Sequence, residues 1–180
     1  VYMELSVGQK VSYPNQGVCL VEHIEKKTIG NSSMQFYSLR VLSDNSTIFV
    51  PTDNAENVGI RPILDNKQCK KLMDYIADDF TEVSHDWKIR SREFSEKLQS
   101  GDVFEAADVL KKLTFLSHEK KLSFREQTFM DKAKFLIVSE IINADLAKDE
   151  KILENKIDKL VEKACTKHSI IQPSVMAASH

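Results

Sequence analysis

Residues 7–18 read VGQKVSYPNQGV, a segment in which apolar and polar side chains alternate until a Pro and a Gly interrupt the pattern. Such alternation is typical of a strand with one buried face, and Pro and Gly favour turns. Residues 18–25 alternate in the same way. The sequence therefore predicts two antiparallel strands joined by a turn over residues 14–17.

A second hairpin is indicated further along, where residues 36–42 and 46–50 flank the turn-forming residues SDN at 43–45. Four or five short strands of this kind suit a small, partly open antiparallel β-barrel, which we place at residues 1–65. An open barrel keeps an edge strand whose unpaired amide and carbonyl groups offer a docking edge to another protein. The alternative is a barrel that only supports the rest of the chain.

Beyond residue 65 the chain adopts helical periodicity, and three residue pairs have the capping-box spacing. In a capping box, the cap side chain and the N3 side chain each bond an otherwise unpaired backbone amide. The three pairs are Asp65 with Gln68, Asp102 with Glu105, and Ser123 with Glu126. Helices are predicted near residues 66–79, 85–99, 102–118, 124–147 and 150–167.

The expected fold class is therefore α+β, with the small antiparallel barrel followed by an all-helical domain of about five helices over residues 66–167. Residues 168–180 contain Pro173 and several Ser and Ala, and such a terminal segment favours a flexible tail. The change in periodicity near residue 65 predicts two modules of different class on one chain.

The 180 residues are 42% apolar and 29% charged, which is the range of ordinary globular proteins. No segment approaches the roughly 18 uninterrupted apolar residues that a membrane span needs, and the first residues lack the pattern of a secretion signal. We expect a cytoplasmic protein without a membrane partner.

Catalytic or metal chemistry has little support in the sequence. The three cysteines are far apart and lack the Cys-x-x-Cys spacing of a zinc site, and the five histidines show no ligand spacing. No Gly-rich phosphate loop, His-Glu-x-x-His motif or nucleophile elbow is present. We expect no cofactor, no metal, no small-molecule substrate and no enzymatic activity.

The charge distribution limits how the chain can bind nucleic acid. Its formal net charge is −2, although residues 85–125 carry nine Lys and Arg against seven Asp and Glu. Affinity for DNA comes largely from many cations that displace counterions from phosphates. Contact with DNA is therefore expected to be local, and weak unless another protein assists it.

Residues 84–92 read SHDWKIRSR and hold the only tryptophan of the chain, Trp87, followed by Lys88, Arg90 and Arg92. A tryptophan ring in the first turn of a helix can wedge beside a base, because it presents a large flat apolar face. The cations that follow it can hold the phosphates on either side. This segment is the candidate DNA-binding site.

Burial of the tryptophan is the alternative interpretation of the same segment. On a helical wheel Trp87, Phe94 and Leu98 share one stripe and can all pack into a core together. Taken alone, the residues leave both the wedge and the core interpretation open.

Several motifs in a fixed order carry a resemblance to a known family. They are Val7-Gly8 through Tyr13-Pro14, Gly17-Val18, Val50-Pro51 with Asn54-Ala55, Val58-Gly59-Ile60-Arg61, Trp87 followed by a basic helix, and Leu98 through Ser100-Gly101-Asp102. With these motifs, over about residues 4–165, the chain resembles the CarD/CdnL family of bacterial transcription regulators.

For the barrel, the resemblance implies a Tudor-like RNA polymerase-interacting domain, similar to the one in transcription-repair coupling factor, which docks on the RNA polymerase β subunit. Lys27 falls where a basic residue helps the family grip polymerase. Phe49 stands where some relatives have an arginine, and with Val50 and Pro51 it belongs to the expected docking edge.

For the helical domain, the resemblance implies contact with promoter DNA. Trp87 matches a family tryptophan that wedges into the minor groove at the upstream edge of the transcription bubble and stabilises the open complex. Arg90 and Arg92 match basic positions beside it, and with Lys88 they are the expected phosphate contacts.

These expectations agree with the modest charge of the chain. Stacking on one base contributes only about 1–3 kcal/mol, so the helical domain alone would bind DNA weakly. Tethering to polymerase raises the effective concentration of the DNA-binding surface. The hypothesis is a polymerase-bound regulator of initiation, and the alternative is a protein–protein adaptor on polymerase that never touches DNA.

Overall fold

The computed structural model describes the backbone of residues 4–178 and the side chains of residues 4–171. The chain divides into two compact units, Val1–Ile63 and Leu64–His180, and each is described by itself. Among the described residues, every helix is too short or too polar to cross a membrane.

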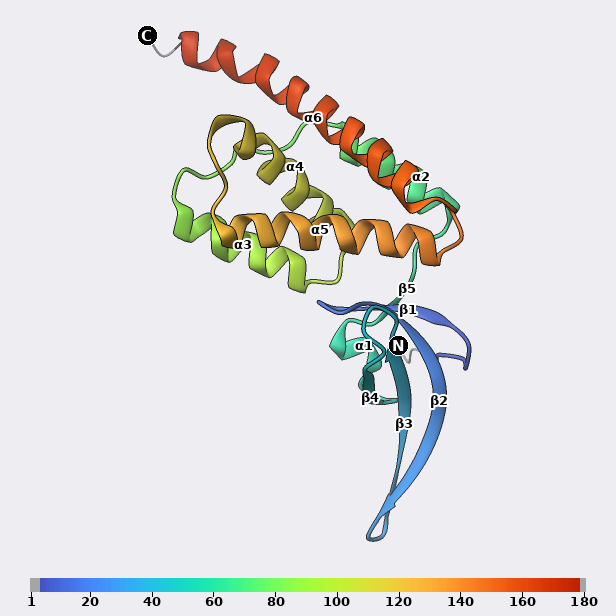
Figure 1. The fold of residues 1–180 in the computed structure, drawn as a ribbon. Coiled ribbons are helices and arrows are strands. Elements are labelled where there is room, and N and C mark those ends of the chain that lie inside the picture. The colour runs from blue at the N-terminus through green and yellow to red at the C-terminus, as the bar shows by residue number, and fades with distance from the viewer. Residues whose placement is uncertain (1–3, 179–180) are drawn as a thin grey trace. The chain divides into compact units, whose positions relative to one another are not determined.

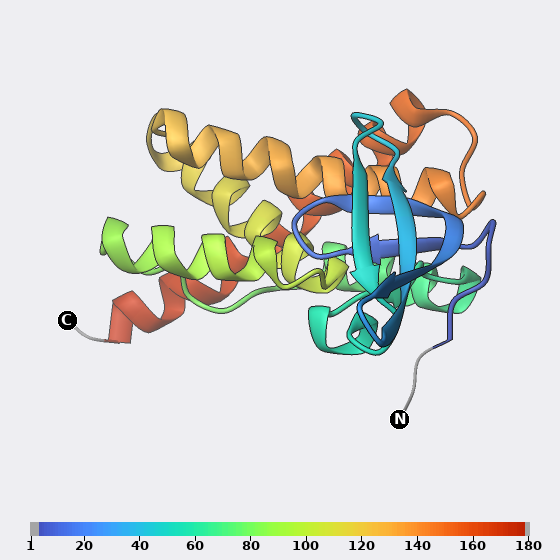
Figure 2. The same cartoon turned by 90° about the horizontal axis from the view of Figure 1, so that it is seen from below.

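The first unit is a five-stranded antiparallel sheet with the strand order β4-β3-β2-β1-β5 (Figure 1). The strands are β1 (Lys10–Tyr13), β2 (Gly17–Ile29), β3 (Ser32–Val41), β4 (Thr47–Pro51) and β5 (Arg61–Pro62), with a one-turn helix α1 (Ala55–Val58) before β5. The sheet curls strongly on itself (Figure 2), and β4 and β5 form its two edges. Both predicted hairpins are confirmed, and the turns between their strands contain Gly17 and Asn45 with positive φ angles of 87° and 60°.

The core of this unit lies on one face of the sheet, where the alternating apolar side chains meet. Val11, Val21, Leu39 and Val41 are fully buried, each on the inward side of its strand. Tyr37 is also buried, and its hydroxyl accepts a hydrogen bond of 3.0 Å from the backbone amide of Leu5. The alternation seen in the sequence is therefore the register that places these residues inside.

Strands β2 and β3 continue together well beyond this core as a two-stranded ribbon (Figure 1). Their pairing runs from Cys19 opposite Val41 to Ile29 opposite Ser32, with an irregularity between Val21 and His23. Past that irregularity the side chains of β2 are exposed or only partly buried. The ribbon is thus built by backbone hydrogen bonds with little apolar burial.

The second unit consists of five helices, so the predicted α+β class is confirmed. They are α2 (Asn66–Ala77), α3 (Trp87–Gln99), α4 (Val103–Glu119), α5 (Phe124–Asn143) and α6 (Glu150–Ala178). Helix α4 is central: it contacts the other four helices and buries ten of its residues. One apolar core, which includes Phe94, Leu113 and Ile137, joins them all.

Two of the three predicted capping boxes are present, at the starts of α2 and α5. The third is absent. Asp102 does cap α4, accepting a 2.8 Å hydrogen bond from the amide of Phe104, but Glu105 lies 3.4 Å from the Lys97 ammonium of α3 instead of bonding the cap amide. The Asp102 amide donates instead to Ser100 Oγ at 3.2 Å, and the Glu105 carboxylate is left to the ion pair with Lys97.

Several helix boundaries differ from the prediction, and α2 ends at Ala77 rather than 79. Helix α3 begins at Trp87 rather than 85, because Asp86 is its N-cap. Helix α5 ends at Asn143 rather than 147, because Asp145 adopts a left-handed φ of 57° and the Leu146 amide bonds back to the Ile141 carbonyl.

Most of the predicted tail over residues 168–180 is helical, since α6 continues to Ala178 instead of ending near 167. His168 is buried on α6: its Nδ1 lies 2.7 Å from Asp79 Oδ1, and its ring stacks on Phe80 with centroids 4.1 Å apart. These contacts hold the turn of α6 around His168 against the α2–α3 connection. Residues 179–180 lie outside the described residues.

Candidate nucleic-acid interface

Trp87 is the first residue of α3, and its position is set by the cap that precedes it. The Asp86 carboxylate accepts a 2.9 Å hydrogen bond from the Lys88 amide, while the Asp86 amide donates to Ser84 Oγ at 3.3 Å. The Trp87 side chain is 65% exposed. The interpretation that Trp87 packs into the core is therefore wrong, although Phe94 of the same stripe is buried.

A shallow hollow on the surface brings cations to this ring. It is lined by Trp87, Lys88, Ser91, Arg92, Ser95, Glu96 and Arg125. The Lys88 ammonium lies 5.7 Å from the centroid of the Trp87 ring, and the side chains of Arg92 and Arg125 are exposed. Three cations and one carboxylate thus surround an exposed aromatic face, which suits a polyanion with stacked bases.

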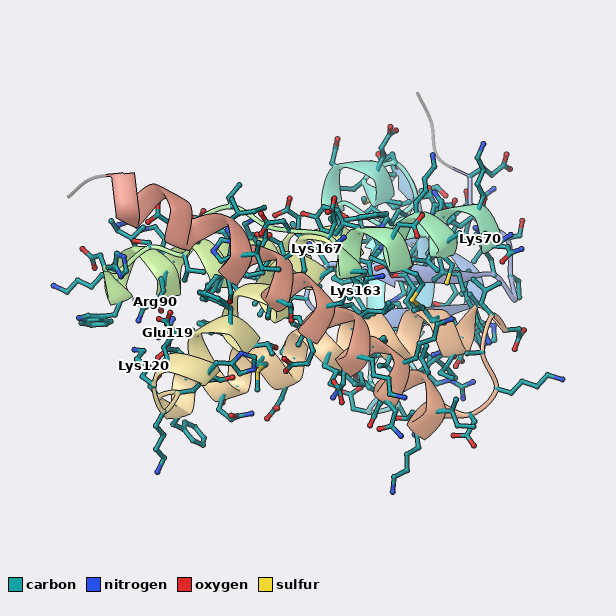
Figure 3. All side chains as sticks on the ribbon, turned by 90° about the horizontal axis from the view of Figure 1, so that it is seen from above. Lys70, Arg90, Glu119, Lys120, Lys163 and Lys167 are labelled. Carbon is teal, nitrogen blue, oxygen red and sulfur yellow. The ribbon has the colours of Figure 1, made fainter. Side chains whose placement is uncertain are left out.

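Arg90 does not belong to this exposed surface, and its predicted phosphate contact is contradicted. It is only 5% exposed, because its spacing of four residues from Phe94 puts it on the inward face of α3. Its Nη1 donates to the carbonyls of Ser84 at 2.9 Å and His85 at 3.0 Å, and its Nη2 lies 3.5 Å from Glu126 Oε2 of α5. Figure 3 shows Arg90 at the same end of the helical unit as Glu119 and Lys120.

Two residues that the sequence analysis missed complete this surface. Phe124 is the first residue of α5 and is 90% exposed, and Arg125, which follows it, lines the same hollow as Trp87. A signal was present, since Ser123-Phe124-Arg125 repeats the order of cap, aromatic residue and cation found at residues 86–88.

In the first unit, three of the four predicted partner-binding residues lie on edge strand β4, and the fourth, Lys27, lies on β2. Phe49 is 52% exposed, and the Lys27 ammonium lies 5.0 Å from the centroid of its ring. Pro51 is partly exposed and pairs with Phe36 of β3. The Val50 side chain, however, is buried in the core at 3% exposure, so a partner can reach only its backbone.

Other chemistry finds no centre in the described part of the chain. No three His, Cys, Asp or Glu side chains gather there as a metal site. The cysteines are free and buried, and burial raises the pKa of Cys19 to about 11 and that of Cys165 to about 12. These two thiols therefore stay protonated at neutral pH and are poor nucleophiles.

Comparison with known proteins assigns each unit to a family model. Residues 5–64 match the CarD-like/TRCF RID domain, and residues 71–158 match the CarD C-terminal domain. A protein of Bacillus subtilis strain 168, named "Putative transcription factor YdeB", is 28% identical over 135 residues, which cover 75% of this chain and 88% of that protein. The solution structure of the N-terminal domain of Myxococcus xanthus CarD is 34% identical, covers 34% of this chain and 83% of its own, and has a TM-score of 0.29.

Proposed function

Because this chain belongs to the CarD/CdnL family of transcription regulators, we propose that it acts on transcription initiation while bound to RNA polymerase in the cytoplasm. The first unit would bind the polymerase β subunit, and the helical unit would contact promoter DNA from the minor groove. No catalytic step is part of this function.

The observation that carries the DNA part of the proposal is the exposure of Trp87 at the start of α3. An apolar ring that inserts beside a base step unstacks it at a cost of a few kcal/mol, so it binds best where the duplex is already opened. The upstream edge of the transcription bubble is such a place. A preference of about 1.4 kcal/mol for the open promoter shifts the equilibrium tenfold.

The cations around the ring have separate roles in this proposal. Lys88, Arg92 and Arg125 are exposed and would pair with phosphates, whereas the exposed Phe124 would offer a separate apolar contact from the first turn of α5. Arg90, which is buried, is removed from the predicted set of phosphate contacts. Few phosphate contacts remain, which again requires polymerase to hold the protein at the promoter.

On the polymerase side, edge strand β4 supports docking by strand addition. Its exposed Phe49, covered on one side by Lys27, would be the main side-chain contact, and the β4 backbone would supply hydrogen bonds. The adaptor alternative shares this surface and differs only in the role of the helical unit.

The first test is the lifetime of the open complex on a fork-junction promoter with purified polymerase. We expect Trp87→Ala to remove the lifetime gain, about tenfold, while polymerase binding is retained. Ile89→Ala removes another exposed apolar side chain of α3 and serves as the matched control. A Trp87→Ala protein that prolongs the lifetime as the wild type does would favour the adaptor function.

The polymerase contact is tested separately by Phe49→Ala. We expect its affinity for the β subunit to fall at least about fivefold, since an aromatic side chain at an interface commonly contributes more than 1 kcal/mol. Val7→Ala changes a comparably exposed side chain of the same unit and is expected to bind normally. Equal affinities of the two variants, measured by calorimetry, would contradict the assignment of β4 as the docking edge.

A further inference from the structure

We propose that Arg90 and Glu126 form a clamp between α3 and α5 that fixes the first turn of α3, which carries Trp87, relative to the first turn of α5, whose Arg125 lines the same hollow as Trp87. Arg90 is then a positioning residue rather than a phosphate contact. The inference rests on the proposed DNA contact, although the clamp itself is a property of the free protein.

On the α3 side, Arg90 holds the chain that leads into the helix. Its Nη1 bonds both the Ser84 carbonyl at 2.9 Å and the His85 carbonyl at 3.0 Å. These two residues directly precede the Asp86 cap, so the guanidinium ties the entering segment to the first turn of its own helix. Trp87 follows immediately and cannot shift unless these bonds change.

On the α5 side, Glu126 has two tasks at once. Its Oε1 accepts from the Ser123 amide at 3.3 Å and its own amide donates to Ser123 Oγ at 3.1 Å, which completes the capping box. Its Oε2 faces Arg90 Nη2 at 3.5 Å. Phe124 lies inside this capped turn, so the carboxylate that fixes Phe124 is the one that faces Arg90.

The chemistry of the pair favours a geometric role over a stabilising one. Both side chains are largely buried, 6% exposed for Arg90 and 14% for Glu126, and neither Arg90 Nε nor Glu126 Oε2 has a hydrogen-bond partner, so the 3.5 Å contact between Arg90 Nη2 and Glu126 Oε2 is an ion pair without a hydrogen bond. Replacing such a pair by apolar residues often leaves stability unchanged or improves it, so buried ion pairs are poor stabilisers. A planar guanidinium can, however, reach two carbonyls and a carboxylate together, which a lysine ammonium cannot do.

Charge-conserving variants separate positioning from phosphate contact. Arg90→Lys keeps the charge but cannot span the three acceptors, and Glu126→Gln keeps the size of the side chain without its charge. We expect each to shorten the open-complex lifetime about tenfold, and the double variant to be no worse than either single one, because residues in one contact network couple. Lys70→Arg is the control at an exposed cation of the same unit, on α2, and should retain the wild-type lifetime.

A readout in the free protein makes the test independent of DNA. Since Trp87 is the only tryptophan, its fluorescence anisotropy reports the mobility of that ring alone. We expect the anisotropy to fall in Arg90→Lys and in Glu126→Gln while far-ultraviolet circular dichroism is unchanged, and not to fall in Lys70→Arg. If Arg90→Lys unfolds, Glu126→Gln decides the question.

Two results would overturn the clamp. One is an open-complex lifetime and a Trp87 anisotropy equal to those of the wild type in both Arg90→Lys and Glu126→Gln. The other is a normal open-complex lifetime in Arg90→Lys together with a shortened lifetime in Arg90→Ala. In that case the plot of log K for DNA binding against log salt concentration would also be shallower by about 0.9 in Arg90→Ala, which is the signature of one lost phosphate contact. Failure of the proposed function gives a different result. Trp87→Ala would then leave the open-complex lifetime unchanged, while the anisotropy of Trp87 would still fall in Arg90→Lys and Glu126→Gln.

Discussion

Phe94→Ala is expected to lower the free energy of unfolding of the helical unit by about 3–5 kcal/mol. Phe94 is fully buried and lies on the inward face of α3, between Arg90 and Leu98. Its removal leaves a cavity that the packed helices can fill only in part. Denaturant unfolding followed by circular dichroism at helical wavelengths measures the change, since most of the helix belongs to this unit.

Trp87→Ala provides the matched comparison, because it removes an even larger aromatic side chain from the same helix. Its ring is mostly exposed, so the free energy of unfolding should change by no more than about 0.5 kcal/mol. Two aromatic residues seven positions apart are thus expected to have different roles: Phe94 stabilises the fold, and Trp87 serves binding. A loss of stability in Trp87→Ala as large as that in Phe94→Ala would mean that the tryptophan ring is part of the core.

Asp108→Asn is the second change with a large expected effect, again about 3–5 kcal/mol of lost stability. Asp108 is buried on α4 and pairs with Lys97 of α3 and with Lys112, whose ammonium lies 3.1 Å away. Lys112 is itself buried, with Glu93 at 3.0 Å as its other partner. Without the Asp108 charge, the buried Lys112 ammonium keeps only one of its two carboxylate partners, and a buried charge that loses a partner strongly lowers stability.

The pH dependence of stability tests the same network. Burial alone would raise the pKa of Asp108, but the hydrogen bond from Lys97 and the charge of Lys112 outweigh it and hold the pKa below its ordinary 3.8. Folding therefore favours the charged form: the contribution is complete above about pH 3.8 and is lost as the pH falls through the lower folded value. Thermal unfolding of wild type and Asp108→Asn should differ most at neutral pH and converge in acid. A difference that is constant down to acid pH would contradict the role of the charge.

At alkaline pH the same network changes stability in the opposite direction, through the titration of Lys97. Burial alone would lower the pKa of Lys97, but its hydrogen bond and charge interaction with Asp108 raise the pKa above its ordinary 10.5. This stabilisation is present below that value and is lost as the pH rises through the folded pKa.

The sequence predicts best those features that depend on neighbours in the chain. Strand alternation around Val11 and the capping boxes at Asp65 and Ser123 are local patterns, and the structure contains each of them. The box expected at Asp102 fails because Lys97, on another helix, competes for the Glu105 carboxylate. Local rules cannot include a partner that only tertiary packing supplies.

The candidate site shows the same limit. Trp87 is found readily, since a single tryptophan before several cations is visible in one segment. The burial of Arg90 is not visible in the sequence, because its partner Glu126 lies 36 positions further along the chain. The burial of His168 depends in the same way on a distant partner, Asp79. A cation near an aromatic residue looks the same in sequence whether it faces solvent or another helix.

The long β2–β3 ribbon sets up a gradient of local stability within the first unit. Its backbone ladder runs from Cys19 to Ile29 with one irregularity between Val21 and His23, but apolar burial on β2 ends near Val21, so opening the distal part breaks few packed contacts. Amide protons near the Gly30 tip should therefore exchange with solvent far faster than those at the base. A partner that binds the distal ribbon must order a segment that opens locally in the free protein. The free energy of this ordering is subtracted from the binding free energy, so the apparent affinity is lower than the contacts alone would give.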